Sequence, residues 1–155
     1  MTVPTANRQF FVDTNVLLYT LDGRDQGKQH AAREWVDRLW FYSAGAVSWQ
    51  VLNEFYQAGR YKLKWPDDKL RHDVETLALW EPVPNTLSLA RRAWFWMDNA
   101  SLHYWDALVV AAAEQACCAY LLTEDLQTGR KFAGLTVVNP FAHSPADLGL
   151  KVYLH

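Results

Sequence analysis

The chain has 155 residues, half of them apolar, and a formal net charge of −2. This length and composition exclude a disordered protein, because the chain can bury a sizeable hydrophobic core, and they are most simply accommodated in one domain over residues 1–155. The charge excludes a surface coated in basic groups for general nucleic-acid binding, although a small basic rim would leave little trace in the total.

Helix and strand patterns alternate through the first half of the chain, which favours a mostly parallel sheet covered by helices. Short apolar runs predict the strands, apolar residues at helical spacing predict the helices, and glycines with aspartates mark the first loop. The predicted elements are a strand at 9–12, a helix at 15–21, a loop at 22–27, a helix at 30–41, a strand at 45–48 and a helix at 50–61.

The second half continues the same alternation. Pro66 suits the first turn of a helix, and the segment 104–117 is hydrophobic almost all round, so it should form the most buried helix. The predicted elements are a helix from Pro66 to about 79, an edge strand at 81–83, helices at 85–98 and 104–117, and strands at 119–122 and 135–138, with no element predicted for 139–155.

Acidic residues follow two of the predicted strands. Asp13 comes directly after the strand at 9–12, and Asp125 lies just beyond the strand at 119–122. Because ligands of a parallel sheet bind at the carboxyl ends of its strands, we expect both carboxylates at that edge.

Two further acids reach the same edge from helices. Glu54 lies on the helix that begins after Ser48, where the strand at 45–48 ends. Asp106 opens the helix that leads back into the strand at 119–122, so the start of this helix also lies at the carboxyl edge. Each acid taken singly has an ordinary alternative as a helix cap, a turn residue or a solvated side chain. Those roles do not predict that all of them converge.

A cluster of carboxylates without basic partners needs compensation. The charges repel one another, and desolvation raises their pKa values further. A hard divalent cation with oxygen ligands offsets both effects. The sequence therefore predicts a Mg²⁺ or Mn²⁺ site formed by Asp13, Glu54, Asp106 and Asp125.

Five segments of the chain, in the family's order, resemble motifs of PIN-domain ribonucleases, in particular VapC-like toxins of prokaryotic toxin–antitoxin pairs. They are FVDTNVLLY (11–19), VSWQVLNEF (47–55), WDALVVAAA (105–113), LLTEDLQTG (121–129) and VNPF (138–141). The resemblance spans about residues 9–141 and leaves 142–155 as a C-terminal tail.

The resemblance implies an α/β fold of three layers, with a parallel sheet of four to five strands in the order 3-2-1-4-5 between helices. It also implies metal-dependent cleavage of RNA, homodimers and inhibition by a cognate antitoxin protein. By carry-over, Asp13, Glu54, Asp106 and Asp125 match the acidic quartet, and Asn15, Ser48 and Thr123 match its polar companions.

The short side chains of Asp13 and Asp106, at the ends of elements, make them the expected direct metal ligands. Asp125 and Glu54 are expected to bind the metal through water, and one of them to accept the proton of the attacking water. The polar companions Asn15, Ser48 and Thr123 are expected to orient waters or carboxylates.

Basic residues are needed to contact RNA phosphates. Arg130 and Lys131 follow Asp125 by five and six residues, which makes them the predicted contacts. His103 precedes Asp106 by three residues and is either an acid near the leaving oxygen or an ordinary exposed residue. The apolar surface of the second, third and fourth predicted helices is the expected seat of the antitoxin.

Residues 2–9 are polar and lack the apolar segment of a signal peptide. The longest apolar stretch, 107–122, is interrupted by Glu114, which argues against a membrane span. The adjacent Cys117 and Cys118 are unsuited to a mutual disulfide. These features predict a cytoplasmic protein with no membrane partner.

Three alternatives remain beside the ribonuclease. A phosphatase of the haloacid-dehalogenase kind would require a second aspartate where the chain has Asn15. A receiver domain would require a phospho-acceptor aspartate after a middle strand, and none is present. A PIN-like module that binds RNA or protein without cleaving it would retain the fold, but the complete acidic quartet argues against it.

Overall fold

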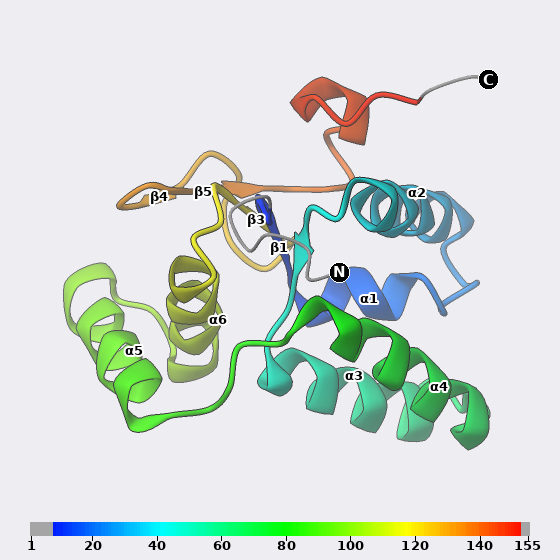
Figure 1. Cartoon of the computed structure of the whole chain (residues 1–155), viewed down its shortest axis with the longest axis horizontal. Helices are drawn as coiled ribbons and strands as arrows, with labels where there is room; N and C mark the ends of the chain where they lie inside the picture. Colours follow the sequence, from blue (N-terminus) through cyan, green and yellow to red (C-terminus); the bar gives the residue numbers. More distant parts are fainter. Residues whose placement is uncertain (1–7, 153–155) are drawn as a thin grey trace.

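The computed structural model describes residues 8–152, and Figure 1 shows one sheet with helices packed around it. The strand order is β2-β1-β3-β5-β4. The first four of these strands pair in parallel, and β4 pairs antiparallel with β5. The strands are β1 (Phe10–Val12), β2 (Gly45–Ala46), β3 (Tyr120–Leu122), β4 (Lys131–Phe132) and β5 (Leu135–Val138).

The predicted order of the strands is confirmed, with two differences at the edges of the sheet. The predicted edge strand at 81–83 is reduced to a single parallel bridge between Val83 and Ser48. At the other edge the chain adds β4, which was not predicted. This strand has two residues and turns back through Ala133, whose φ is 54°. Such a short hairpin carries too few residues to show a period of two.

Six α-helices surround the sheet in the described part of the chain. They are α1 (Thr14–Tyr19), α2 (Gln26–Tyr42), α3 (Trp49–Tyr61), α4 (Asp67–Leu77), α5 (Leu87–Ala100) and α6 (Tyr104–Gln115), with short 3₁₀ segments η2 (Ala78–Trp80) and η3 (Pro145–Leu148). Helix α2 begins four residues before its predicted start, because the side chain of Asp25 caps it by accepting from Lys28 N at 3.1 Å. Segment η3 lies in the tail for which no element was predicted.

Helices cover both faces of the sheet. Trp35 of α2 packs against Phe10 of β1, with ring centroids 5.7 Å apart. Trp96 of α5 packs against Phe132 of β4 at 5.3 Å. The register of the strands places the Phe10 and Phe132 side chains on opposite faces. Figure 1 accordingly shows α2 and the α5–α6 pair on different flanks of the sheet, which gives the predicted three layers.

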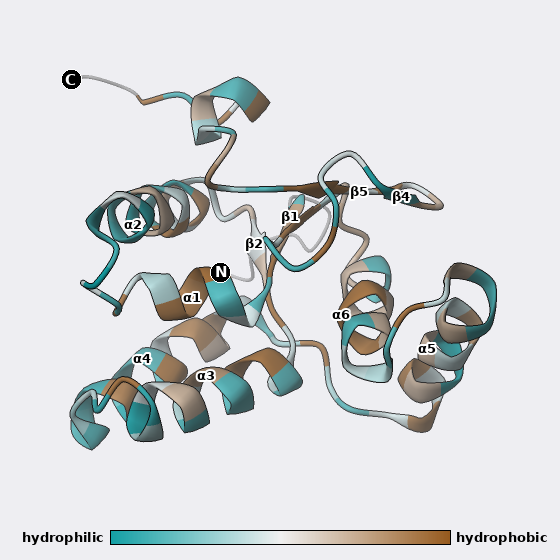
Figure 2. Cartoon of the chain, turned by 180° about the vertical axis from the view of Figure 1, so that it is seen from behind, coloured by the Kyte–Doolittle hydropathy of each residue, from teal (hydrophilic) through white to brown (hydrophobic). Residues whose placement is uncertain are grey.

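Helix α6 is the most buried helix, as its uniform hydrophobicity predicted. Every residue from Ala107 to Ala113 is buried, and Figure 2 shows the apolar colouring of α6 and of the strands it packs against. The following Cys117 and Cys118 are both free, the first exposed and the second buried. Within residues 8–152, no helix is long and apolar enough to cross a membrane.

Candidate active site

Asp13 lies where β1 passes into α1, at the carboxyl edge of the sheet. It is the N-cap of α1, and its Oδ1 accepts from the backbone N of Thr14 at 2.7 Å. Its Oδ2 accepts from the hydroxyl of Thr123, at the end of β3, at 2.8 Å. The side chain is only 6 % exposed. Two neighbouring parallel strands therefore hold one buried carboxylate between them.

Asn15 connects Asp13 with Asp125. Its Nδ2 lies 3.3 Å from Asp13 Oδ2, 3.0 Å from Asp125 Oδ2 and 3.0 Å from Thr123 Oγ1. Thr123 is fully buried, and its hydroxyl also accepts from the backbone N of Asp125 at 3.1 Å. We refer to Asp13, Asn15, Thr123 and Asp125 as the strand-end half of the site.

Burial raises the pKa of Asp13 to about 7. Hydrogen bonds from Thr123 and Thr14 oppose this rise, because they favour the ionised carboxylate. The negative charges of Asp125 and Glu54 add to it. Asp13 therefore sits in an environment that disfavours its own negative charge and that a bound cation would relieve.

Glu54 reaches the site from the second turn of α3. Its Oε2 accepts from Thr14 Oγ1 at 2.8 Å, and its Oε1 accepts from Gln50 Nε2 at 3.1 Å. The same Gln50 amide nitrogen lies 3.4 Å from the backbone carbonyl oxygen of Trp105, the residue before Asp106. Gln50 is buried, and its Oε1 has no hydrogen-bond partner within residues 8–152. The Gln50 amide thus links α3, which carries Glu54, to α6, which carries Asp106. We refer to Gln50, Glu54 and Asp106 as the helix half of the site.

Asp106 lies in the first turn of α6 and is half-buried. Burial raises its pKa, and the charges of Asp125 and Glu54 raise it further. The electrostatic interaction with His103 opposes this rise in the pKa of Asp106. His103 is the exposed N-cap residue of α6, and its side chain makes no capping hydrogen bond. The histidine is therefore near Asp106 but open to solvent.

Three other predicted residues make no hydrogen bond or ion pair with the four acids within residues 8–152. Ser48 is fully buried, and its hydroxyl caps α3 by accepting from Val51 N at 3.2 Å. Arg130 donates to the carbonyl oxygen of Ala100 at 2.7 Å and stacks on the ring of Phe132. Lys131 is exposed on β4.

The donor set fits a hard divalent cation in charge and in atom type. Asp13 and Asp106 each feel the charges of Glu54 and Asp125, so the quartet is electrostatically coupled. No ion pair between residues 8 and 152 involves any of the four. In the same range, no three His, Cys, Asp or Glu side chains form a group that could hold a metal by themselves. Oxygen ligands supplemented by water are what Mg²⁺ prefers.

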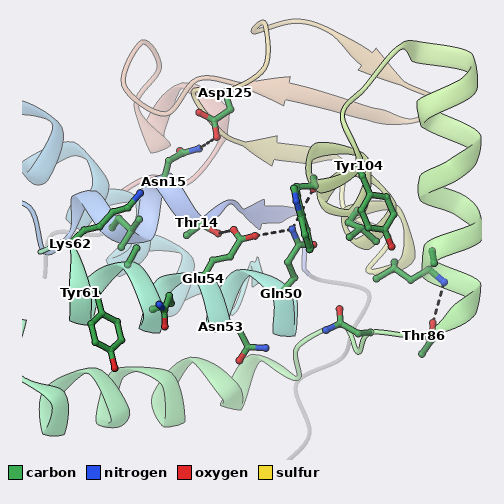
Figure 3. Close-up of a pocket in the computed structure, with 18 of the residues that line it drawn as sticks. Thr14, Asn15, Gln50, Asn53, Glu54, Tyr61, Lys62, Thr86, Tyr104 and Asp125 are labelled. Atoms are coloured by element: carbon green, nitrogen blue, oxygen red, sulfur yellow. Dashed lines mark hydrogen bonds between the residues drawn. The ribbon is translucent and has the colours of Figure 1, made fainter.

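An open groove of about 1130 Å³ runs beside the quartet. One wall is a face of α3, and the other is formed by the starts of α5 and α6, as Figure 3 shows from the labelled Thr86 and Tyr104. Glu54 and Asp125 line the groove at its acidic end, and Lys62 lines it at the C-terminal end of α3. Among the described residues that line it, neither Arg130 nor Lys131 is present.

The sequence analysis missed two residues that contact the quartet, Thr14 and Gln50. Gln50 precedes Glu54 by one helical turn, a spacing that allows contact on one helix face and was a usable signal. Thr14 lies between two residues that were identified, and its hydroxyl points toward α3 rather than toward Asp13. Only the placement of α3 against α1 determines that contact.

Comparison with known proteins agrees with this architecture. The family model described as the PIN domain matches residues 10–132. Among solved structures, VapC20 of Mycobacterium tuberculosis, described as a sarcin–ricin loop cleaving toxin, is similar with a TM-score of 0.55 and 18 % identity, over 76 % of this chain and 90 % of that one. No curated protein sequence matches the chain. Since the family model covers well over half of its residues, the chain belongs to the PIN-domain family.

Proposed function

We propose that the chain is a metal-dependent endoribonuclease that hydrolyses RNA phosphodiester bonds and acts as the toxin of a toxin–antitoxin pair. The observation that carries the proposal is the coupled quartet of carboxylates, in which no member makes an ion pair within residues 8–152, beside an open groove. Membership of the PIN-domain family supports nuclease chemistry. The description of VapC20 as a sarcin–ricin loop cleaving toxin supports the toxin role.

In this mechanism Asp13 and Asp106 would hold a Mg²⁺ or Mn²⁺ ion directly, with Asp125 and Glu54 acting through water. Such an ion, when bound, supplies Lewis acidity to a water and to the scissile phosphate. The exposed Asp125 or the half-buried Glu54 accepts the proton of the attacking water.

The chain's polar side chains orient these acids. Asn15 and Thr123 restrict the carboxylates of Asp13 and Asp125. Thr14 and Gln50 bind the two oxygens of Glu54, so that carboxylate cannot rotate freely. Ser48 acts indirectly, because its hydroxyl caps the start of α3 and so fixes the direction from which Glu54 enters the site.

The proposal includes two protein partners, a cognate antitoxin and a second copy of the chain. A cleft of about 400 Å³ among α1, α2, α3 and α4, lined by Trp40, Phe55 and Leu77, supports the expected antitoxin seat on α2 to α4. The homodimer is tested by light scattering of the purified protein. Arg130 and Lys131 remain predicted phosphate contacts for an RNA that extends beyond the groove toward β4.

The test is cleavage of a panel of structured RNAs, including a sarcin–ricin loop, by purified protein with Mg²⁺, Mn²⁺ or EDTA. We expect discrete cuts that require metal, disappear in Asp13→Asn and persist in Asp98→Asn, a change at an exposed aspartate of α5. Cuts that persist equally in Asp13→Asn would identify a contaminating nuclease. A folded, metal-binding protein that cuts nothing in the panel would be a PIN-like binding module.

A further inference from the structure

The α3 wall of the groove carries neutral amides where a nucleic-acid backbone site would carry cations. Gln50, Asn53, Gln57 and Tyr61 line the groove at helical spacing, so they form one face of α3. Figure 3 shows Gln50, Asn53 and Tyr61 along this wall. Amides present both donors and acceptors, the groups that read the edges of nucleobases.

Two of these amides have no role in the structure itself. Asn53 and Gln57 are exposed, and neither side chain makes a hydrogen bond within the described part of the chain. Gln50 differs, because it is buried and binds Glu54. The outer amides of α3 are therefore available to a ligand in the groove, next to the acid that Gln50 fixes.

On the opposite wall, Trp105 presents a large aromatic surface next to the acids. It is 63 % exposed although it lies in the first turn of α6, directly before Asp106. Its backbone is bound by the Gln50 amide, and its ring lies 5.5 Å from that of Tyr104. The indole is thus exposed but attached to a fixed backbone, and stacking a base on it would cover apolar surface now open to water.

A single cation lines the groove among the described residues. Lys62, at the end of α3, is exposed and makes no ion pair within residues 8–152. It also lines a smaller, adjoining groove together with Asn15 and Leu18. A phosphate at Lys62 would lie on a path that leads from the acids along α3.

We propose that Trp105, Asn53, Gln57 and Lys62 hold unpaired RNA in this groove, with one base stacked on Trp105, base edges hydrogen-bonded by Asn53 and Gln57, and a phosphate at Lys62. The proposal rests on the proposed ribonuclease function and deepens it, because it names the residues that hold the substrate and select its sequence. A basic peptide fits less well, since the acids Glu54 and Asp125 line only one end of the groove and the α3 wall beyond Glu54 carries amides.

The test measures binding of a labelled, unstructured RNA of about twelve nucleotides by fluorescence anisotropy, in a cleavage-deficient Asp13→Asn background. We expect Trp105→Ala to weaken binding about tenfold and Trp105→Phe about threefold or less, because phenylalanine keeps an aromatic face. Trp94→Ala is the matched control, since Trp94 is 48 % exposed on α5 and does not line the groove. It should leave binding unchanged.

A scan of single abasic sites along the RNA identifies the stacked base. An abasic site at one position should weaken binding to the protein with Trp105 about tenfold. The same abasic site should leave binding to Trp105→Ala unchanged, because the two changes remove the same contact. Asn53→Ala and Gln57→Ala should reduce the discrimination between bases at neighbouring positions while binding of a fully abasic strand stays the same.

Three results would overturn the assignment. The first is an abasic site that weakens binding equally with and without Trp105. The second is an equal loss of RNA affinity in Trp94→Ala and Trp105→Ala. The third is a Trp105→Ala protein that loses affinity for a basic peptide but not for RNA. Cleavage by the wild-type protein is measured separately. Coupled binding without cleavage would refute the nuclease and keep the RNA groove, whereas Asp13-dependent cleavage without coupling would refute the groove and keep the nuclease.

Discussion

The two halves of the site are held together differently. In the strand-end half, Asp13 and Asp125 belong to one hydrogen-bond network with Asn15 and Thr123. In the helix half, the Gln50 amide donates to the Glu54 carboxylate and to the backbone carbonyl before Asp106. The first half is built on adjacent parallel strands and contains a buried carboxylate. The second joins two helices whose packing sets its dimensions. The strand-end half is therefore fixed by strand pairing and a shared hydrogen-bond network, whereas the geometry of the helix half depends on how α3 and α6 pack.

The largest expected effect is on cleavage, and it should be the same in both halves. Asp13→Asn and Asp106→Asn should each reduce the single-turnover rate at least about 10³-fold, because each removes a proposed direct metal ligand. Their stabilities should differ, since Asp13 is buried, whereas Asp106 is half-buried and its side chain makes no hydrogen bond within residues 8–152. Urea unfolding of both variants beside Asp98→Asn measures this. A normal rate in Asp106→Asn would remove Asp106 from the site.

The buried carboxylate of the strand-end half should make the metal-free protein sensitive to pH. Asp13 has an ordinary pKa of 3.8 and a folded pKa of about 7. Between these values the folded chain holds a proton that the unfolded chain has released, so stability falls as the pH rises through this window. The penalty is absent below pH 3.8 and complete above about pH 7.

Asp13→Asn should remove this dependence and raise the free energy of unfolding by roughly 2–4 kcal/mol at pH 8 in EDTA. Near pH 4 its effect should be small. Denaturation in urea at several pH values, with Asp98→Asn as the control that keeps the slope, provides the measurement. A wild-type protein as stable at pH 8 as at pH 5 without metal would contradict the burial argument.

Thr123→Val breaks the strand-end half while preserving its shape. The variant removes the shorter of the two hydrogen bonds to Asp13 Oδ2 and leaves only the Asn15 amide at 3.3 Å, so we expect a loss of about 1–3 kcal/mol in stability and about 10- to 100-fold in cleavage rate. Thr136→Val on β5 is the control, because Thr136 is half-buried on the same sheet and its hydroxyl makes no hydrogen bond within residues 8–152. Equal losses in the two variants would indicate a packing effect only.

Gln50→Leu breaks the helix half and should have the smallest effect. Cleavage should fall about tenfold because Glu54 loses one of its two donors. Stability should change by less than about 1 kcal/mol, since the leucine also removes the amide oxygen that is buried without a partner. Gln115→Ala, at an exposed position near the end of α6, is the control. A large stability loss in Gln50→Leu would mean that the amide holds the helices together.

The convergence of the acids was predictable because it depends on topology. Asp13 and Asp125 follow parallel strands, and Glu54 and Asp106 lie near helix starts that the alternation of elements places at the same edge. Asp13 and Asp106 each feel the charges of Asp125 and Glu54, although no three such side chains within residues 8–152 form a group that could hold a metal by themselves. Their individual roles in metal binding stay predictions.

The remaining differences arise where distance along the chain is a poor guide to distance in space. Arg130 is close to Asp125 in sequence, but it lies directly before β4 and donates to the carbonyl oxygen of Ala100. Among the acids of the quartet, only Glu54 is near Lys62 in sequence, yet the course of α3 brings Lys62 to the groove that Asp125 also lines. Such placements follow from helix packing, which hydrophobic periodicity does not encode.

The distribution of the site along the chain also determines when during synthesis it can form. Asp13 and Thr123, which share a hydrogen bond, are 110 residues apart. Strand β3, which presents Thr123, lies between β1 and β5, so it gains its second neighbour only when β5 has been made. The ribosome must therefore translate past Val138, the last residue of β5, before the quartet is assembled. Chains that terminate earlier carry acids of the quartet without the completed sheet that brings them together.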